Sequence, residues 1–104
     1  MSKITLNTRA SSNNLFEVLT KIDNTELMKS FLCDILTKKE IDDISMRLLA
    51  ARMLIGGCKY QDISDKTGLS SRTIARISSW IRRGNKGYSK IISKNSHIKP
   101  VYAD

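Results

Sequence analysis

The sequence predicts an all-α domain built from six helices. Apolar residues recur along most of the chain at the three- and four-residue spacing of amphipathic helices. Residues that typically start and stop helices separate these stretches. The chain contains one proline, Pro100, and 6% aromatic residues, which argues against a β-protein with many turns. Its 104 residues correspond to a single domain.

The N-terminal part predicts a short arm and two helices. We expect residues 1–10 to form a flexible N-terminal arm. Potential capping residues at 11–14 open a first helix, whose apolar stripe ends at Ile22. Thr25 is expected to cap a second helix, whose apolar residues extend to Ile35.

A capping box predicts the start of the longest helix. Thr37 and Glu40 have the spacing at which each side chain satisfies a free backbone donor of the other residue. We therefore expect a helix from about Lys38 to Ile55. Apolar residues on several of its sides indicate that it is the central packing element, and Gly56-Gly57 ends it.

The strongest functional signal is a helix-turn-helix. A short helix over about residues 60–67 stops at Gly68, because glycine tolerates the left-handed conformation of a sharp turn. The next helix covers about residues 71–83, is capped by Ser70 or Ser71, and turns Ile74 and Ile77 inward. Its other face carries small, hydrogen-bonding or cationic residues that suit base edges and phosphates, namely Ser71, Arg72, Ala75, Arg76 and Ser79.

The distribution of charge favours a DNA-binding helix-turn-helix over an ordinary two-helix corner. Residues 59–103 contain ten lysines and arginines against two aspartates, whereas residues 1–58 contain eight basic and seven acidic residues. Nearly all of the net charge of +8 therefore lies in and after the helix-turn-helix. A polyanionic partner accounts for this asymmetry better than a solvated surface does.

The remaining segments give no sign of catalysis. A last helix is expected over about residues 87–94, and residues 95–104 form a flexible tail. Cys33 and Cys58 are expected to be buried free thiols, and their spacing together with the isolated His97 does not suit a metal site. Neither a nucleophile–base cluster nor a glycine-rich phosphate loop occurs. We therefore expect no metal, no cofactor and no enzymatic activity.

Five segments combine into a recognisable pattern: Leu36-Thr37 with Glu40, Arg47–Gly57, Tyr60–Ile63, Thr67–Ile77 and Gly84–Tyr88. Over about residues 12–94 the chain resembles the Trp repressor superfamily, and more closely its YerC/YecD group. The resemblance implies an all-helical homodimer with intertwined N-terminal helices. Each subunit would present one recognition helix to successive major grooves of a palindromic DNA site.

The resemblance also implies a pocket. The Trp repressor holds tryptophan between two arginines, which correspond to Arg47 and Arg76, and Thr37 matches a pocket threonine. Ile77 replaces a glycine and Trp80 replaces a serine, and both larger side chains would fill the space of the indole. We therefore do not expect free L-tryptophan as ligand, and another small-molecule effector stays open.

Several of these residues also have ordinary structural interpretations. Arg47 has the spacing for an ion pair with Asp43, one turn earlier on the same helix. Arg76 lies on the exposed side, which favours a phosphate or base contact. Trp80 is expected in the core or filling the pocket, and Tyr88 in the core.

The expected function is sequence-specific binding of double-stranded DNA by a homodimeric transcriptional regulator, most simply a repressor. A cytoplasmic, nucleoid-associated location without a membrane is expected, because no apolar stretch approaches the ~20 residues that span a bilayer. Alternatives are a protein-interaction or scaffold module that does not read DNA, a tryptophan-responsive repressor, and an RNA-binding protein, although few aromatic residues accompany the basic ones. The candidate DNA-contacting residues are Lys59, Tyr60, Gln61, Ser70, Ser71, Arg72, Thr73, Arg76, Ser79, Arg82 and Arg83.

Overall fold

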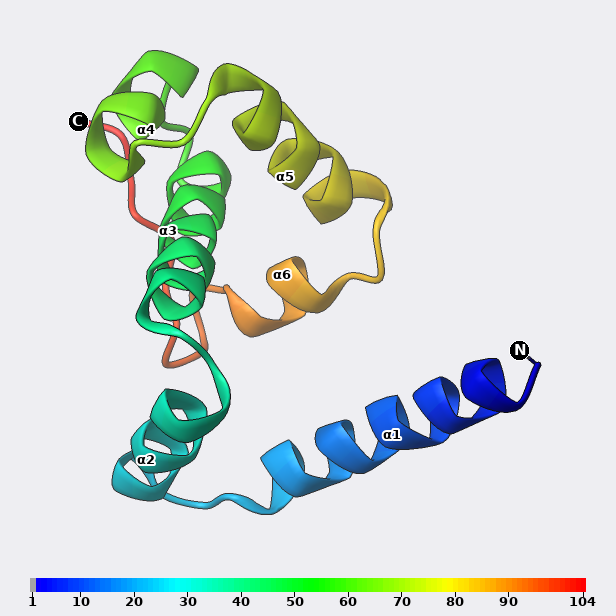
Figure 1. Ribbon diagram of the computed structural model, residues 1–104. Helices are drawn as coiled ribbons and strands as arrows, with labels where there is room; N and C mark the ends of the chain where they lie inside the picture. The colour runs from blue at the N-terminus through cyan, green and yellow to red at the C-terminus, as the bar shows by residue number, and fades with distance from the viewer. Residues whose placement is uncertain (1) are drawn as a thin grey trace. The chain divides into compact units, whose positions relative to one another are not determined.

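A computed structural model describes residues 2–104, and side chains from residue 9 onward. This part of the chain contains six helices and no strand (Figure 1): α1 (Ser2–Lys21), α2 (Thr25–Ile35), α3 (Lys38–Ile55), α4 (Tyr60–Thr67), α5 (Ser71–Arg83) and α6 (Gly87–Ile91). The all-α prediction is therefore confirmed. The chain divides into two compact units, the first ending at Lys38 and the second comprising residues 39–104. None of the helices described is long and apolar enough to cross a membrane.

The first unit corrects two expected helix starts. Helix α1 begins at Ser2, so the predicted arm is helical from that residue and the expected caps at 11–14 lie inside the helix. Residues 2–21 contain neither glycine nor proline, and nothing local interrupts the helix. The cap of α2 is Asn24 rather than Thr25. The Asn24 Oδ1 atom accepts a hydrogen bond of 2.8 Å from the N–H group of Leu27.

The first unit has no buried core of its own. Among the side chains described in residues 9–38, none is buried. Cys33 is exposed, which corrects the expectation of a buried thiol. Large apolar side chains are exposed as well, namely Leu15, Phe16, Val18, Leu27 and Ile35. The apolar stripes of α1 and α2 therefore stay largely exposed in this unit.

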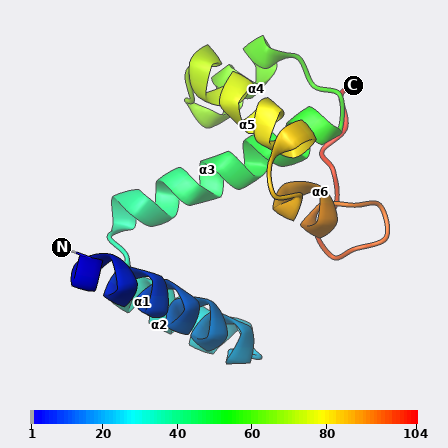
Figure 2. The same ribbon diagram turned by 90° about the vertical axis from the view of Figure 1, so that its right-hand side faces the viewer.

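The second unit does have a core. Figure 2 shows α4 and α5 beside the C-terminal half of α3, and the fully buried side chains come from these three helices: Ala50, Ala51, Ile63, Ile74 and Ile77. The small alanine side chains of α3 permit close packing of the neighbouring helices. Only this half of α3 is the central packing element that we predicted. No residue of its first half, 38–46, is buried, and Ile44 there is exposed.

The C-terminal residues correct a further expectation. Helix α6 ends at Ile91, before the predicted limit near residue 94. Ile92 then pairs with Ile98 in an isolated parallel bridge. The N–H groups of Val101 and Ala103 donate hydrogen bonds to carbonyl oxygens at the end of α3. The segment expected to be a flexible tail is therefore attached to the second unit.

Candidate nucleic-acid interface

The turn between α4 and α5 has the geometry that the sequence predicts. Gly68 follows α4 with a φ of 75°, in the left-handed region that favours glycine. Its N–H group donates to the carbonyl oxygen of Ser64 at 2.8 Å and so ends the helix. Leu69 then packs against the core. The result is a tight corner that leads directly into α5.

Two hydroxyl groups fix this corner, and our sequence analysis did not identify them. The Ser64 Oγ atom donates to the carbonyl oxygen of Leu69 at 2.8 Å. The buried Thr67 Oγ1 atom donates to the carbonyl oxygen of Ile63 at 2.7 Å and accepts from the N–H group of Leu69 at 3.2 Å. Hydroxyl side chains within a turn of the stop glycine were the available signal, because serine and threonine bond readily to nearby backbone.

The start of α5 is capped by Ser70, one of the two predicted candidates. Its Oγ atom accepts a hydrogen bond of 3.2 Å from the Thr73 N–H group and lies 3.1 Å from the Thr73 hydroxyl. Both side chains are thus engaged with each other. Ser71 and Arg72 follow in the first turn and are exposed.

Helix α5 separates a core face from a solvent face. Ile74 and Ile77 are fully buried, whereas Arg72, Ala75 and Arg76 are exposed. Ser79 is half-buried near the middle of the helix. The predicted reading face is therefore open to solvent in its first two turns, where the two arginines stand one turn apart.

The start of α4 contributes a second set of predicted residues. Lys59 occupies the N-cap position without a side-chain cap bond, and Tyr60 is exposed. The Gln61 side chain is also exposed, but its Nε2 atom donates to the Asp65 carboxylate at 2.8 Å. Lys59 and Tyr60 are therefore the more available groups at this end of α4.

The end of α5 is cationic but partly engaged within the chain. The Arg82 guanidinium donates to Ser78 Oγ at 2.9 Å, and Lys86 Nζ donates to the carbonyl oxygen of Arg82 at 2.7 Å. The lysine thus binds a free carbonyl at the helix end, where positive charge is favourable. Arg83 is exposed.

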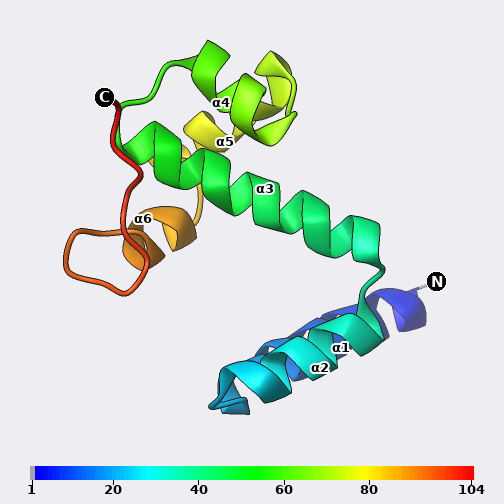
Figure 3. The same cartoon turned by 90° about the vertical axis from the view of Figure 1, so that its left-hand side faces the viewer.

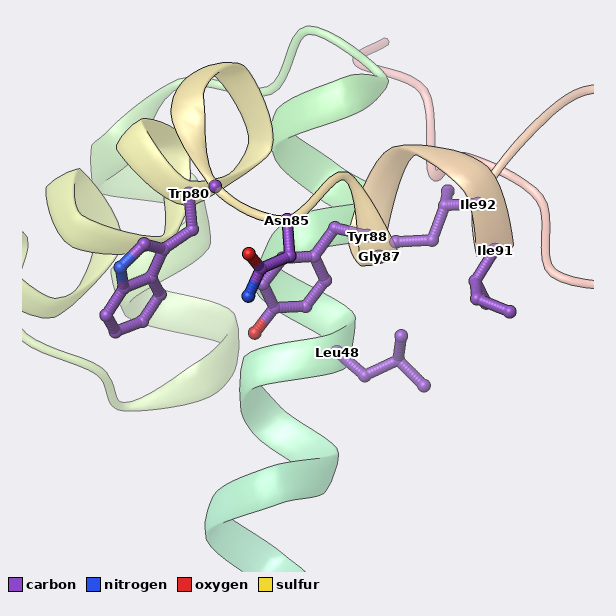
Figure 4. A pocket seen from close by; sticks show the side chains of 8 residues that line it. Leu48, Trp80, Asn85, Gly87, Tyr88, Ile91 and Ile92 are labelled. Carbon is purple, nitrogen blue, oxygen red and sulfur yellow. The ribbon is translucent and has the colours of Figure 1, made fainter. Parts of the chain in front are cut away.

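A hollow of about 510 Å³ opens beside α5 (Figure 4). Trp80 is 46% exposed and forms part of its wall, so of the two expectations for this side chain the position in the core is wrong. Tyr88 packs against the core, as expected. The lining is uncharged and mostly apolar: Leu48, Trp80, Gly84, Asn85, Gly87, Tyr88, Ile91 and Ile92.

The predicted tryptophan pocket coincides with this hollow only at Trp80. Ile77 belongs to the buried core, and neither Arg47 nor Arg76 lines the hollow. Thr37 belongs to the first unit. The Asp43 carboxylate pairs with Lys39 at 3.3 Å rather than with Arg47.

Comparison with known proteins gives consistent matches. The sequence model of the family described as Trp repressor protein matches residues 10–96. YerC of Bacillus subtilis, an uncharacterized protein, is 32% identical over 82 residues, which are 79% of each chain. A TrpR-like protein from Eubacterium eligens superposes with a TM-score of 0.75 at 32% identity, over 79% of this chain and 84% of the other. A candidate Trp repressor from Staphylococcus aureus gives 0.74 at 33%, over 79% and 82%. The chain belongs to the Trp repressor protein family.

Proposed function

We propose that the protein is a sequence-specific, double-stranded-DNA-binding transcriptional regulator that acts as a homodimer. The observation that carries this proposal is the exposed reading face of α5, with Arg72 and Arg76 in its first two turns and Ile74 and Ile77 behind them in the core. Membership of the Trp repressor family supports the same function.

The charge around this face suits a polyanion. No acidic residue occurs between Asp65 and Asp104, whereas basic residues recur throughout that interval. Phosphate contacts from such residues supply much of the affinity for DNA, and side chains in the major groove supply specificity. The helix dipole adds partial positive charge at the start of α5, where a phosphate oxygen is favoured.

We assign different roles to the two ends of the interface. Arg72 and Arg76 read base edges or adjacent phosphates, and Lys59, Tyr60 and Arg83 contact the backbone. Ser70 and Thr73 hold the first turn of α5 in place through their mutual hydrogen bonds. Gln61 and Arg82 are each bonded within the chain, to Asp65 and Ser78, and Arg82 keeps further guanidinium donors for a phosphate.

A second copy of the chain is the proposed cover for the exposed apolar residues. In the first unit these include Phe16, which is 60% exposed, and Leu27. In the second unit they include Ile44, Leu48 and Ile91. A monomer rarely leaves so much apolar surface exposed, and a small domain gains a larger core by association.

Selection from random-sequence DNA duplexes tests the proposal. We expect enrichment of a palindromic sequence whose half-sites are separated by about one helical turn, as for other helix-turn-helix dimers. Affinity for it should fall steeply between about 50 and about 200 mM salt, because several phosphate contacts release counterions. A flat salt response, or binding to single-stranded RNA that equals binding to the selected duplex, contradicts the proposal.

A matched pair of variants separates the reading face from general charge. Arg76→Ala removes one positive charge from the reading face, whereas Lys39→Ala removes one from α3, where Lys39 is largely exposed and pairs with Asp43. We expect the first substitution to weaken duplex binding and the second to leave it nearly unchanged. Equal losses indicate that only net charge matters.

A further inference from the structure

The junction between α3 and α4 leads into the helix-turn-helix that α4 and α5 form. Only residues 56–59 join the two helices. Gly57, with a φ of 85°, turns the chain, and its N–H group donates to the Leu54 carbonyl oxygen at 3.1 Å. The Cys58 N–H group donates to Met53 at 2.9 Å. These two bonds form a Schellman motif, which closes the end of α3.

Residues 99–103, here called the strap, run along this junction (Figure 3). The Val101 N–H group donates to the Arg52 carbonyl oxygen at 2.9 Å, and the Ala103 N–H group donates to the Gly56 carbonyl oxygen at 3.1 Å. The Cys58 thiol donates to the Val101 carbonyl oxygen at 3.3 Å. The strap thus bonds both the last turn of α3 and the connection that leads to α4.

The strap approaches Gly56 more closely than any side chain would permit. A Cβ atom at this position would overlap the carbonyl group of Val101 and lie 2.9 Å from the Cα atom of Tyr102. The φ angle of Gly56 is not positive, so backbone conformation does not require glycine here. The close passage of the strap does require it.

The chain before the strap is itself fixed. Ser96 Oγ donates to the Ile98 carbonyl oxygen at 2.6 Å and accepts from the Ser93 N–H group at 3.2 Å. Ile98 and Val101 pack against the core, so two apolar anchors flank the start of the strap. Arg52 Nε also donates to the Lys99 carbonyl oxygen at 2.9 Å.

We propose that the strap positions α4 for DNA binding by fixing the α3–α4 junction, with Gly56 and Val101 as the positioning residues. The part of this inference that concerns DNA rests on the proposed function. Residues 97–104 lie outside the segment that matches the family model. An element held by hydrogen bonds at both sides of a short connection restricts the directions that the next helix can take.

Hydrogen exchange in the full-length protein tests the inference. In Gly56→Ala the new methyl group displaces the strap, and the Val101 and Ala103 amides should exchange about tenfold faster or more. If the strap fixes the junction, the amides of Cys58 and Ile63 lose protection as well, because their acceptors lie at the end of α3 and at Lys59. The control is Gly87→Ala, because a Cβ atom added there would contact no other part of the structure within 4 Å.

A second pair covers the case in which Gly56→Ala does not fold. Val101→Ala shortens an anchor that packs against the core, whereas Tyr102→Ala shortens a neighbouring side chain that is 55% exposed. We expect the first variant to accelerate exchange at the strap and at the junction, and the second to leave both unchanged. Strap release without any change at Cys58 and Ile63 overturns the inference, as does an unprotected strap in the unmodified protein.

The functional readout is the affinity for duplex DNA, measured under conditions in which every variant is fully folded. Release of the strap should weaken binding about tenfold, the ratio that corresponds to 1.4 kcal/mol. Unchanged affinity, despite a loosened junction, would show that the strap covers the core without positioning α4. If the unmodified protein binds no duplex, the proposed function fails, and the exchange data still decide whether the strap fixes the junction.

Discussion

The two units of the chain contain similar amphipathic helices, but only the second unit has a buried core. In the second unit, side chains from α3, α4 and α5 meet in a closed core that includes the fully buried Ile63, Ile74 and Ile77. In the first unit, α1 and α2 carry comparable apolar stripes, yet no side chain described in residues 9–38 is buried. Amphipathic helices alone do not make a core, because each stripe needs a facing surface.

Under the proposed function, this difference suits the two units to separate tasks. A reading surface must be rigid before DNA arrives, since ordering it during binding would cost affinity. The second unit meets that requirement from within, through the core and the hydrogen-bonded corner at Ser64 and Thr67. The first unit offers apolar surface, which is what an association interface needs. Under the proposed function, we call the first unit the assembling unit and the second unit the reading unit.

A substitution in the core of the reading unit should have the largest effect, and this effect is on stability. Ile74→Ala removes a fully buried side chain and should lower the free energy of unfolding by about 2–5 kcal/mol, because a cavity remains. Denaturant titration followed by circular dichroism measures this change. Ala75→Ser, at the exposed neighbouring position, is the control and should stay within about 0.5 kcal/mol. A similar small loss for Ile74→Ala would show that the core is not closed.

Substitutions in the assembling unit should change the strength of dimerisation. We expect the protein to sediment at twice the chain mass of 11.7 kDa at micromolar concentration. Phe16→Ala should weaken dimerisation by about 2–4 kcal/mol, the range of a buried aromatic residue at an interface. Sedimentation over a concentration series measures it, with the exposed Glu17→Gln as control. A folded monomer throughout the series for the unmodified chain contradicts the division of tasks.

Within the reading unit, we expect the arginines at the two ends of α5 to make different kinds of DNA contact. Arg72→Ala should cost about 1–3 kcal/mol and relax the sequence preference if this arginine contacts a base. Arg83→Ala, at the opposite end, should weaken all duplexes alike and by less, as a phosphate contact does. Titration of each variant with selected and random duplexes compares them. Equal losses on both duplexes for Arg72→Ala reassign this residue to the backbone.

The sequence predicts the reading unit well because its signals are local. The limits of α3, α4 and α5, the left-handed Gly68 and a cap at Ser70 or Ser71 all follow from residues within one turn of the feature, and the structure selects Ser70. The helix starts of the first unit are harder to predict. Asn24 and Thr25 are both good caps for α2, and residues 2–21 contain no residue that stops a helix.

Features that depend on distant residues were not predictable. The strap has no helical or strand periodicity, and its bonds join positions as far apart as Arg52 and Lys99. Gly56 looks like an ordinary helix stop, although its closest neighbour is the backbone of Val101. Trp80 looks like a core residue by composition, but in the structure it lies beside an open hollow. Such properties follow from packing and not from local pattern.

The smallest expected effect is that of free L-tryptophan, which should not alter DNA binding. The hollow beside Trp80 has an uncharged lining, which offers no cation to the carboxylate of a tryptophan ligand. Ile77 is fully buried, so a glycine-sized space is absent at that position. The reading unit should therefore bind DNA without this corepressor. Calorimetry with millimolar L-tryptophan, with and without the selected duplex, measures both equilibria. Saturable heat together with tighter duplex binding would restore the amino-acid-sensing alternative and place Arg47 and Arg76 in its pocket.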